Sequence, residues 1–137
     1  ENNFSIEKKT TAYYPSKRFQ YGLYLDGAWY KLRLIDSPPS EDLIDNLDVS
    51  ILENFILNPI LNIKDSRTDD RIDFVGGSRH AKGVTDRIES GDMVAGFMLP
   101  PTTIAELMLI ADENKIMPPK STWFEPKLAD GLLSLTI

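Results

Sequence analysis

The strongest constraint on the fold is a pair of apolar segments joined by Asp26-Gly27. In Phe19–Leu25 large apolar residues occupy every second position, and Ala28–Leu34 forms a second apolar segment directly after the Asp-Gly pair. Asp-Gly supplies the positive φ angles of a type I′ turn, and the twist of that turn matches the twist of paired strands. The pattern therefore predicts a β-hairpin, and we expect Trp29 and Tyr30 to pack across its strands.

After the hairpin the sequence alternates between helical and extended patterns. Apolar residues at helical spacing predict a helix over residues 48–57, which ends or bends at Pro59. Thr103 and Glu106 have the spacing of a capping box, so we expect the best-defined helix over residues 103–114. The other expected elements are a first strand around Phe4 and Ile6, a helix over residues 78–90 that stops at Gly91, and strands over residues 72–75, 93–99 and 132–137.

This order of elements predicts the fold class. We expect an α+β (α/β) domain in two layers, with a mixed β-sheet, an N-terminal β-hairpin and about three to four helices. A length of 137 residues suits one domain with its own core, so we expect a single domain over residues 1–137. The sequence does not begin with Met, and we interpret it as a piece of a longer chain.

Composition narrows the classes of function. The sequence has no cysteine, which excludes a disulfide framework and a thiolate metal site. No apolar run approaches the roughly 18 residues of a membrane span, and no signal peptide is recognisable, so we expect a cytoplasmic protein without a membrane partner. A net charge of −6 and a sequence pI near 4.7 weigh against a nucleic-acid partner, because nucleic-acid-binding surfaces are normally basic.

A first candidate site lies where the expected strand over residues 72–75 meets Gly76-Gly77. Two glycines let backbone amides approach an anion, and the following helix offers its positive end. Arg67, Arg71 and Asp73 belong to the same short part of the sequence and favour a phosphate-bearing ligand. We interpret Asp73 as a candidate catalytic carboxylate or magnesium ligand. A tight turn without a ligand explains the two glycines equally well.

A second candidate site is the irregular segment over residues 117–127, in which three prolines fix the backbone. Its candidate ligand-binding and catalytic groups are Lys120, Ser121, Thr122, Glu125 and Lys127. The lysines suit a phosphate as point charges, and Glu125 suits a general base or a magnesium ligand. Alternatively, Glu125 forms a surface ion pair with a lysine, and Trp123-Phe124 anchors the segment in the core. A Walker phosphate loop is excluded, because prolines stand where it needs glycine amides.

Four segments of the chain together resemble one known family. They are Leu23–Tyr30, Leu47–Leu57, Arg67–Gly77 and Ile116–Lys127, and they follow the family's order over most of the chain. The family is the widespread prokaryotic one called domain of unknown function 1015. Ser66 departs from the pattern, since a proline is expected there.

The resemblance implies that the chain is the C-terminal part of a longer cytoplasmic protein. The missing N-terminal part would be its partner, and it would carry the family's histidine-rich segment, which is similar to Gly-His-His-Arg-Tyr. The family has no settled function. Some members are labelled as chromosome-partitioning proteins similar to ParB, in a superfamily that includes nucleotide-hydrolysing and small-metabolite kinase relatives. Shared fold does not by itself carry function.

Three hypotheses follow. In the first, the two candidate sites form part of a phosphate- or nucleotide-binding site of a small-metabolite phosphotransferase, with nucleotide or pyrophosphate and magnesium as cofactors. In the second, the chain is a non-catalytic structural or interaction domain that docks the missing N-terminal part. In the third, it belongs to a ParB-like DNA-associated protein, and the acidic pI weighs against this hypothesis.

Overall fold

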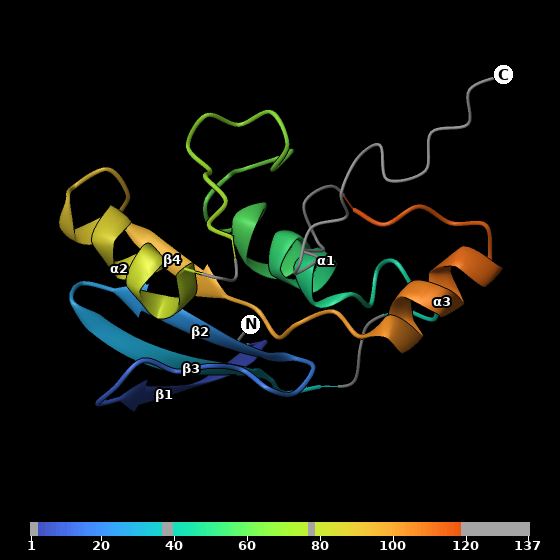
Figure 1. Ribbon diagram of the computed structural model, residues 1–137, viewed down its shortest axis with the longest axis horizontal. Helices are drawn as coiled ribbons and strands as arrows, with labels where there is room; N and C mark the ends of the chain where they lie inside the picture. The colour runs from blue at the N-terminus through green and yellow to red at the C-terminus, as the bar shows by residue number, and fades with distance from the viewer. Residues whose placement is uncertain (1–2, 37–39, 77–78, 119–137) are drawn as a thin grey trace, which may run out of the picture.

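A four-stranded sheet forms the framework of the computed structural model, which describes residues 3–36, 40–76 and 79–118 (Figure 1). The strands are β1 (Phe4–Lys9), β2 (Gln20–Leu25), β3 (Ala28–Leu34) and β4 (Ala95–Met98), in the spatial order β1-β3-β2-β4. Each neighbouring pair is antiparallel. The last strand therefore joins the edge of the hairpin, at β2, from a distant part of the sequence.

The predicted β2–β3 hairpin is confirmed. Leu25 pairs with Ala28, and the two residues between them, Asp26 and Gly27, have φ angles of 49° and 73°. Positive φ at both central positions is the requirement of a type I′ turn. Trp29 lies opposite Tyr24 in the hairpin, and their ring centroids are 5.1 Å apart. The Asp-Gly pair thus fixes the register in which the two strands pack.

In the described ranges four helical segments accompany the sheet. They are α1 (Asp48–Leu52), the π-helical turn η1 (Glu53–Leu57) that continues it, α2 (His80–Glu89) and α3 (Ile104–Asp112). In α3 both halves of the predicted capping box are formed, between Thr103 and Glu106. Gly91 follows α2 with a φ of 86°, as expected for a residue that stops a helix. The start of α1 has no side-chain cap.

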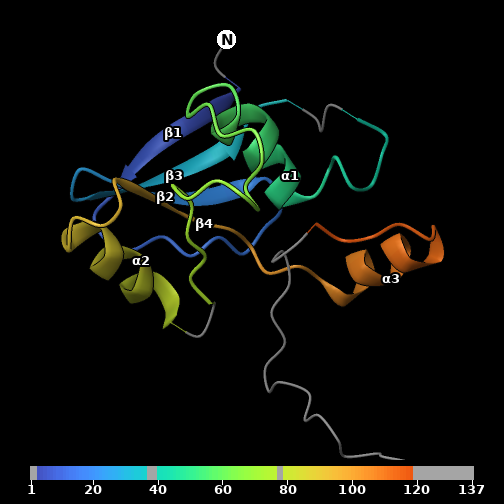
Figure 2. The ribbon, with the colours of Figure 1, turned by 90° about the horizontal axis from the view of Figure 1, so that it is seen from above.

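Helices α1 and α2 pack on opposite faces of the sheet (Figures 1 and 2). One face is covered by α1 and η1, where Ile51, Leu52 and Ile56 cluster with residues of β2 and β3 such as Tyr21 and Leu32. The opposite face carries the side chains of the alternate positions in the same strands. There Tyr24 and Trp29 cluster with Ala81 of α2, and Val84 and Ile88 pack against them. Helix α2 therefore forms a third layer, where the sequence predicted only two layers.

The α+β class with an N-terminal hairpin is confirmed. The strand predicted over residues 72–75 is wrong, because these residues form no strand. The backbone amide of Ile72 donates to the carbonyl oxygen of Asp69 at 3.1 Å, and that of Phe74 donates to the Asp73 carboxylate at 2.8 Å. These local bonds use the amides that a strand ladder needs. The described strands accordingly contain no parallel pair, and the strand expected over residues 132–137 lies outside the described residues.

Within the described ranges no helix has the length and apolar character needed to cross a bilayer. The longest of their helices, α2, has ten residues, and charged side chains such as Lys82, Asp86 and Arg87 project from it. This finding agrees with the absence of a long apolar run in the sequence.

Candidate functional site

The candidate residues fall into a described group and a group outside the described residues. Arg67, Arg71, Asp73 and Gly76 can be placed in the structure. The candidates that lie outside the described residues are Gly77, Lys120, Ser121, Thr122, Glu125 and Lys127. The described part of the two candidate sites is therefore the loop between η1 and α2, together with Met117 and Pro118. These two residues begin the segment over residues 117–127, called here the proline-bounded segment.

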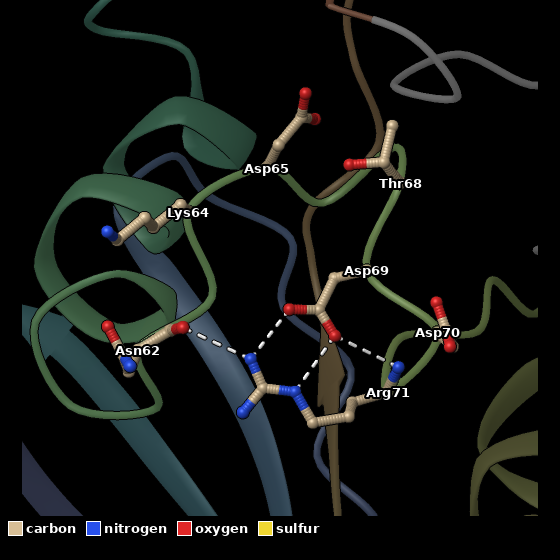
Figure 3. Close-up of a pocket in the computed structure, with 7 residues that line it drawn as sticks. All are labelled: Asn62, Lys64, Asp65, Thr68, Asp69, Asp70 and Arg71. Atoms are coloured by element: carbon tan, nitrogen blue, oxygen red, sulfur yellow. Dashed lines mark hydrogen bonds and ion pairs between the residues drawn. The ribbon is translucent and has the colours of Figure 1, made fainter.

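Arg71 connects this loop to the turn that follows η1. Its Nε and Nη2 donate to the Asp69 carboxylate at 2.9 and 2.6 Å. Its Nη1 donates to the carbonyl of Leu61 at 3.2 Å, and Nη2 also reaches the carbonyl of Asn62 at 3.1 Å. Figure 3 shows the guanidinium pointing to Asn62 and Asp69. Because each nitrogen of the guanidinium already donates within the loop, a ligand contact at Arg71 has to compete with these bonds.

Arg67 forms a two-point ion pair with Asp65. Nε and Nη2 donate to the two carboxylate oxygens at 2.9 and 2.8 Å, and the backbone amide of Arg67 donates to the same carboxylate at 2.9 Å. These bonds hold the pKa of Asp65 well below its usual range, at about 2. The Arg67 side chain remains 61% exposed. An exposed ion pair contributes little stability, so an incoming phosphate can share or replace the carboxylate at Arg67.

Two hollows flank this loop. The first, of about 540 Å³, is called here the Arg71 pocket (Figure 3). It is lined by Asn62, Lys64, Asp65, Thr68, Asp69, Asp70 and Arg71. Three of these side chains are acidic and two are basic, and the Arg71 guanidinium is already paired with Asp69. The field of this pocket therefore disfavours an anion.

The second hollow, of about 260 Å³, is called here the Arg67 pocket. It is lined by Val49, Glu53, Lys64, Asp65, Ser66, Arg67 and Pro118. Two cations, two carboxylates and a hydroxyl meet here, so the charges of this lining balance, whereas acids are in excess in the Arg71 pocket. Pro118 brings the start of the proline-bounded segment beside them. Glu53 opens the π-helical turn η1, and such turns occur frequently at functional sites. The pocket thus joins the two candidate sites, which are some fifty residues apart in the sequence.

Lys64, Ser66 and Glu53 were not candidates from the sequence. Lys64 immediately precedes the Asp65–Arg71 loop, so a cation flanking a loop already rich in arginine was an available signal. Glu53 lies on a helical segment, and its place in the pocket depends on how the chain returns after Pro59. No local sequence pattern carries that information.

Asp73 and Gly76 lie away from both hollows. Asp73 forms an ion pair with Arg87 of α2, with 2.6 Å between Nη2 and the carboxylate oxygen. The Gly76 carbonyl accepts a hydrogen bond from the amide of Arg79 at 3.0 Å. Since residues 72–75 form no strand, the strand–glycine–helix arrangement that motivated an anion site at this turn is not formed. The structure brings Arg67 to the proline-bounded segment, and it attaches Asp73 to α2.

A second polar cluster lies where β2, α1 and α3 meet. The amide of Phe19 donates to Asp48 at 2.6 Å, and Arg18 bridges Asp48 and Glu106 at 4.0 and 3.1 Å. Burial raises the pKa of Asp48 above its usual range, although the bond from Phe19 opposes this. The Tyr21 hydroxyl lies near Asp48 without the geometry of a full hydrogen bond. This cluster connects three elements of the fold.

Replacing Asp48 with asparagine is expected to stabilise the protein near pH 7 and to have a smaller effect near pH 4. A carboxyl whose folded pKa is raised costs stability as pH rises from its unfolded pKa of about 3.8 through its folded pKa, since the folded state binds the proton more tightly. Asparagine keeps an acceptor for the Phe19 amide and removes the charge. Urea unfolding at both pH values measures the difference, and an equal loss of stability at both would contradict this account.

Comparisons with known proteins add no relative, since no family model, curated protein or solved structure matches the chain. Among the residues that the structure describes, no cluster of three or more His, Cys, Asp or Glu side chains is arranged to hold a metal ion. The site is therefore defined by its own geometry: exposed cations, a hydroxyl and single carboxylates around the Arg67 pocket.

Proposed function

We propose that this chain forms part of a phosphate- or nucleotide-binding site in a phosphotransferase-type enzyme that acts on a small metabolite. The observation that carries the proposal is the Arg67 pocket, where Lys64 and the half-exposed Arg67 lie beside Pro118. Pro118 begins the segment that holds Lys120 and Lys127. A lysine two residues after Pro118 is tied to within about 7 Å of it by the length of the chain.

In this proposal the cations position the phosphate and a carboxylate serves the metal or the proton. Arg67 offers a planar fork for phosphate oxygens, and Lys64, Lys120 and Lys127 act as point charges. Ser121 and Thr122 offer hydroxyl donors. Phosphoryl transfer depends mainly on such positioning and on charge stabilisation.

Magnesium fits this set of donors. Mg²⁺ usually keeps several waters and is bound by one or two carboxylates together with the phosphates of the ligand, so it does not need a dense acidic cluster. Glu125 is the first candidate for holding the ion or accepting a proton, because Asp73 is occupied by Arg87. Glu53 and Ser66 supply further hard oxygen atoms at the pocket.

In this proposal a longer protein completes the site. The four segments that resemble domain of unknown function 1015 support a cytoplasmic protein of that family in which this chain is the C-terminal part. The N-terminal part would add the histidine-rich segment, and with it the acid or base groups that a single histidine in this chain cannot supply.

The test is calorimetric titration of the intact protein with magnesium pyrophosphate and with magnesium nucleotide. We expect Arg67→Ala and Lys120→Ala each to weaken binding about 10- to 100-fold, the effect of losing one hydrogen bond between charged groups. Lys82→Ala is the matched control, because Lys82 is an exposed lysine on α2 paired with Asp86. Absence of binding, or equal affinity in all variants, would remove the phosphate-binding proposal and favour the interaction domain.

A further inference from the structure

Helix α3 exposes most of its apolar residues. Ile104, Met108 and Leu109 are 76, 61 and 53% exposed, and only Ile110 of the helix is buried. Ala105 and Ala111 are also exposed. Positions three and four apart lie side by side on a helix, so these five residues form one continuous surface, called here the apolar face of α3.

Apolar residues recur at helical spacing in this helix, at Ile104, Leu107, Met108 and Ala111. Three of them, Ile104, Met108 and Ala111, belong to the exposed face, and in the described residues nothing covers them. Both ribbon views place α3 beyond the end of the sheet, away from the two core clusters (Figures 1 and 2). A helix stabilised by its amphipathic face needs a partner for that face. The partner must therefore come from residues that the structure does not describe, or from another molecule.

The end of the same chain has the composition required of that partner. Residues 119–137 contain the large apolar residues Trp123, Phe124, Leu128, Leu132, Leu133, Leu135 and Ile137. In the last six residues Leu133, Leu135 and Ile137 alternate with Ser134 and Thr136, so an extended backbone there would have one apolar face. That face and the apolar face of α3 are complementary in character.

Chain length and charge both permit this partner. The described residues end at Pro118, six residues after α3, and α3 is about 13 Å long. The nine residues from 119 to 127 can span about 30 Å, which reaches any point of the helix. Asp112 stands at the negative end of α3, where an acidic group is unfavourable, and the last turn of the helix holds no basic residue. The next residue, Glu113, is already paired with Lys115 at 3.0 Å. Lys120 and Lys127 supply the opposite charge.

We infer that the C-terminal segment of this chain, residues 128–137, packs on the apolar face of α3. The contact is intramolecular, and it does not depend on the proposed phosphate site. It also gives the proline-bounded segment a second fixed end, since the segment would be held at Pro118 and again at α3. Residues 119–127 would then form a bridge between the Arg67 pocket and α3.

The first test uses a nitroxide label, which a chain without cysteine accepts at a single introduced position. With the label at Met108→Cys, the amide NMR signals of Leu133 and Leu135 are expected to lose most of their intensity. With the label at Val94→Cys they are expected to keep it. Val94 is 79% exposed and directly precedes β4, so this control also detects the alternative in which the segment pairs with the edge of the sheet.

The second test measures the burial of Met108 without a label. Gln has nearly the same helix propensity as Met, so Met108→Gln removes apolar character with little other change. If the face is covered, this variant lowers Tm by about 4–8 °C. Ile60→Gln is the control, because Ile60 is 70% exposed and lies outside α3, and its Tm should move by less than about 2 °C.

Three results would overturn the inference. The first is loss of the Leu133 and Leu135 signals with the label at Val94. The second is no loss of signal with either label, together with an unchanged Tm for Met108→Gln, and the third is loss of signal when separately prepared labelled chains and isotope-enriched chains are mixed. The last result would assign the face to a second copy of the chain. None of these measurements uses a phosphate ligand, so a result that overturns this inference leaves the phosphate-binding proposal untouched.

Discussion

Replacing Ile51 with alanine is expected to remove about 2–5 kcal/mol from the free energy of unfolding. Ile51 of α1 has no exposed surface, and it clusters with Tyr21 and Leu32 of the sheet. Truncation loses the burial of the removed methyl groups and leaves a cavity that the surrounding side chains fill only in part. A loss of this size is a large fraction of the 5–15 kcal/mol that is typical of a domain.

Ile60→Ala is the matched control for this experiment, since Ile60 is 70% exposed. Its unfolding free energy should stay within about 0.5 kcal/mol of the parent chain. Equilibrium unfolding in urea compares the two variants. Equal, small losses in both would mean that α1 does not form the main core with the sheet.

Gly96→Ala is expected to lower the unfolding free energy by about 1–3 kcal/mol through overcrowding. A Cβ atom on Gly96 of β4 would overlap the Val84 side chain, and it would come within 3.0 Å of Cδ1 of Ile88. Both residues belong to α2, so the glycine lets this helix approach the sheet closely. The effect is a direct measure of the packing of α2 on the face opposite α1.

The double variant Gly96→Ala with Val84→Ala provides the control. Shortening Val84 removes the atoms that the new methyl group would meet, so the double variant should be more stable than additivity of the two single changes predicts. Additive losses, measured by urea unfolding of all four chains, would contradict the close approach of α2 to β4.

Local signals predicted the local structure well. The Asp26-Gly27 turn and the Thr103 capping box form as expected, because each is determined by residues that are neighbours in the sequence. The strand predicted over residues 72–75 was wrong. Its short apolar alternation resembles a strand, but its amides bond to Asp69 and Asp73, and Asp73 pairs with Arg87 of the following helix.

The candidate site was only partly predictable. Arg67 and Arg71 were identified as cations, and each pairs with the carboxylate two residues earlier. Arg71 also donates to the carbonyls of Leu61 and Asn62 in the turn after η1, which leaves it less available than Arg67, and that contact depends on the path of the loop. The approach of Pro118 to Arg67 joins distant parts of the chain, and only the folded structure contains that information.

The apolar face of α3 illustrates a different limit. Periodicity identified an amphipathic helix, but it does not say which element covers the apolar side. In the described residues Ile104 and Met108 remain open to solvent. Solubility of the isolated chain will therefore depend on whether residues 128–137 occupy this face.

The most direct test of the central claim is an NMR titration of this chain with magnesium pyrophosphate, followed through the backbone amides. The account predicts saturable shifts at Lys64, Ser66 and Arg67 and at residues 120–127, with the signals of residues 82–86 on α2 unchanged. Arg67→Ala should move the midpoint of the shifts at Lys64 and Ser66 to an about 10- to 100-fold higher pyrophosphate concentration. Shifts confined to Asp69–Arg71, or no saturable shift at all, would contradict a phosphate site at the Arg67 pocket.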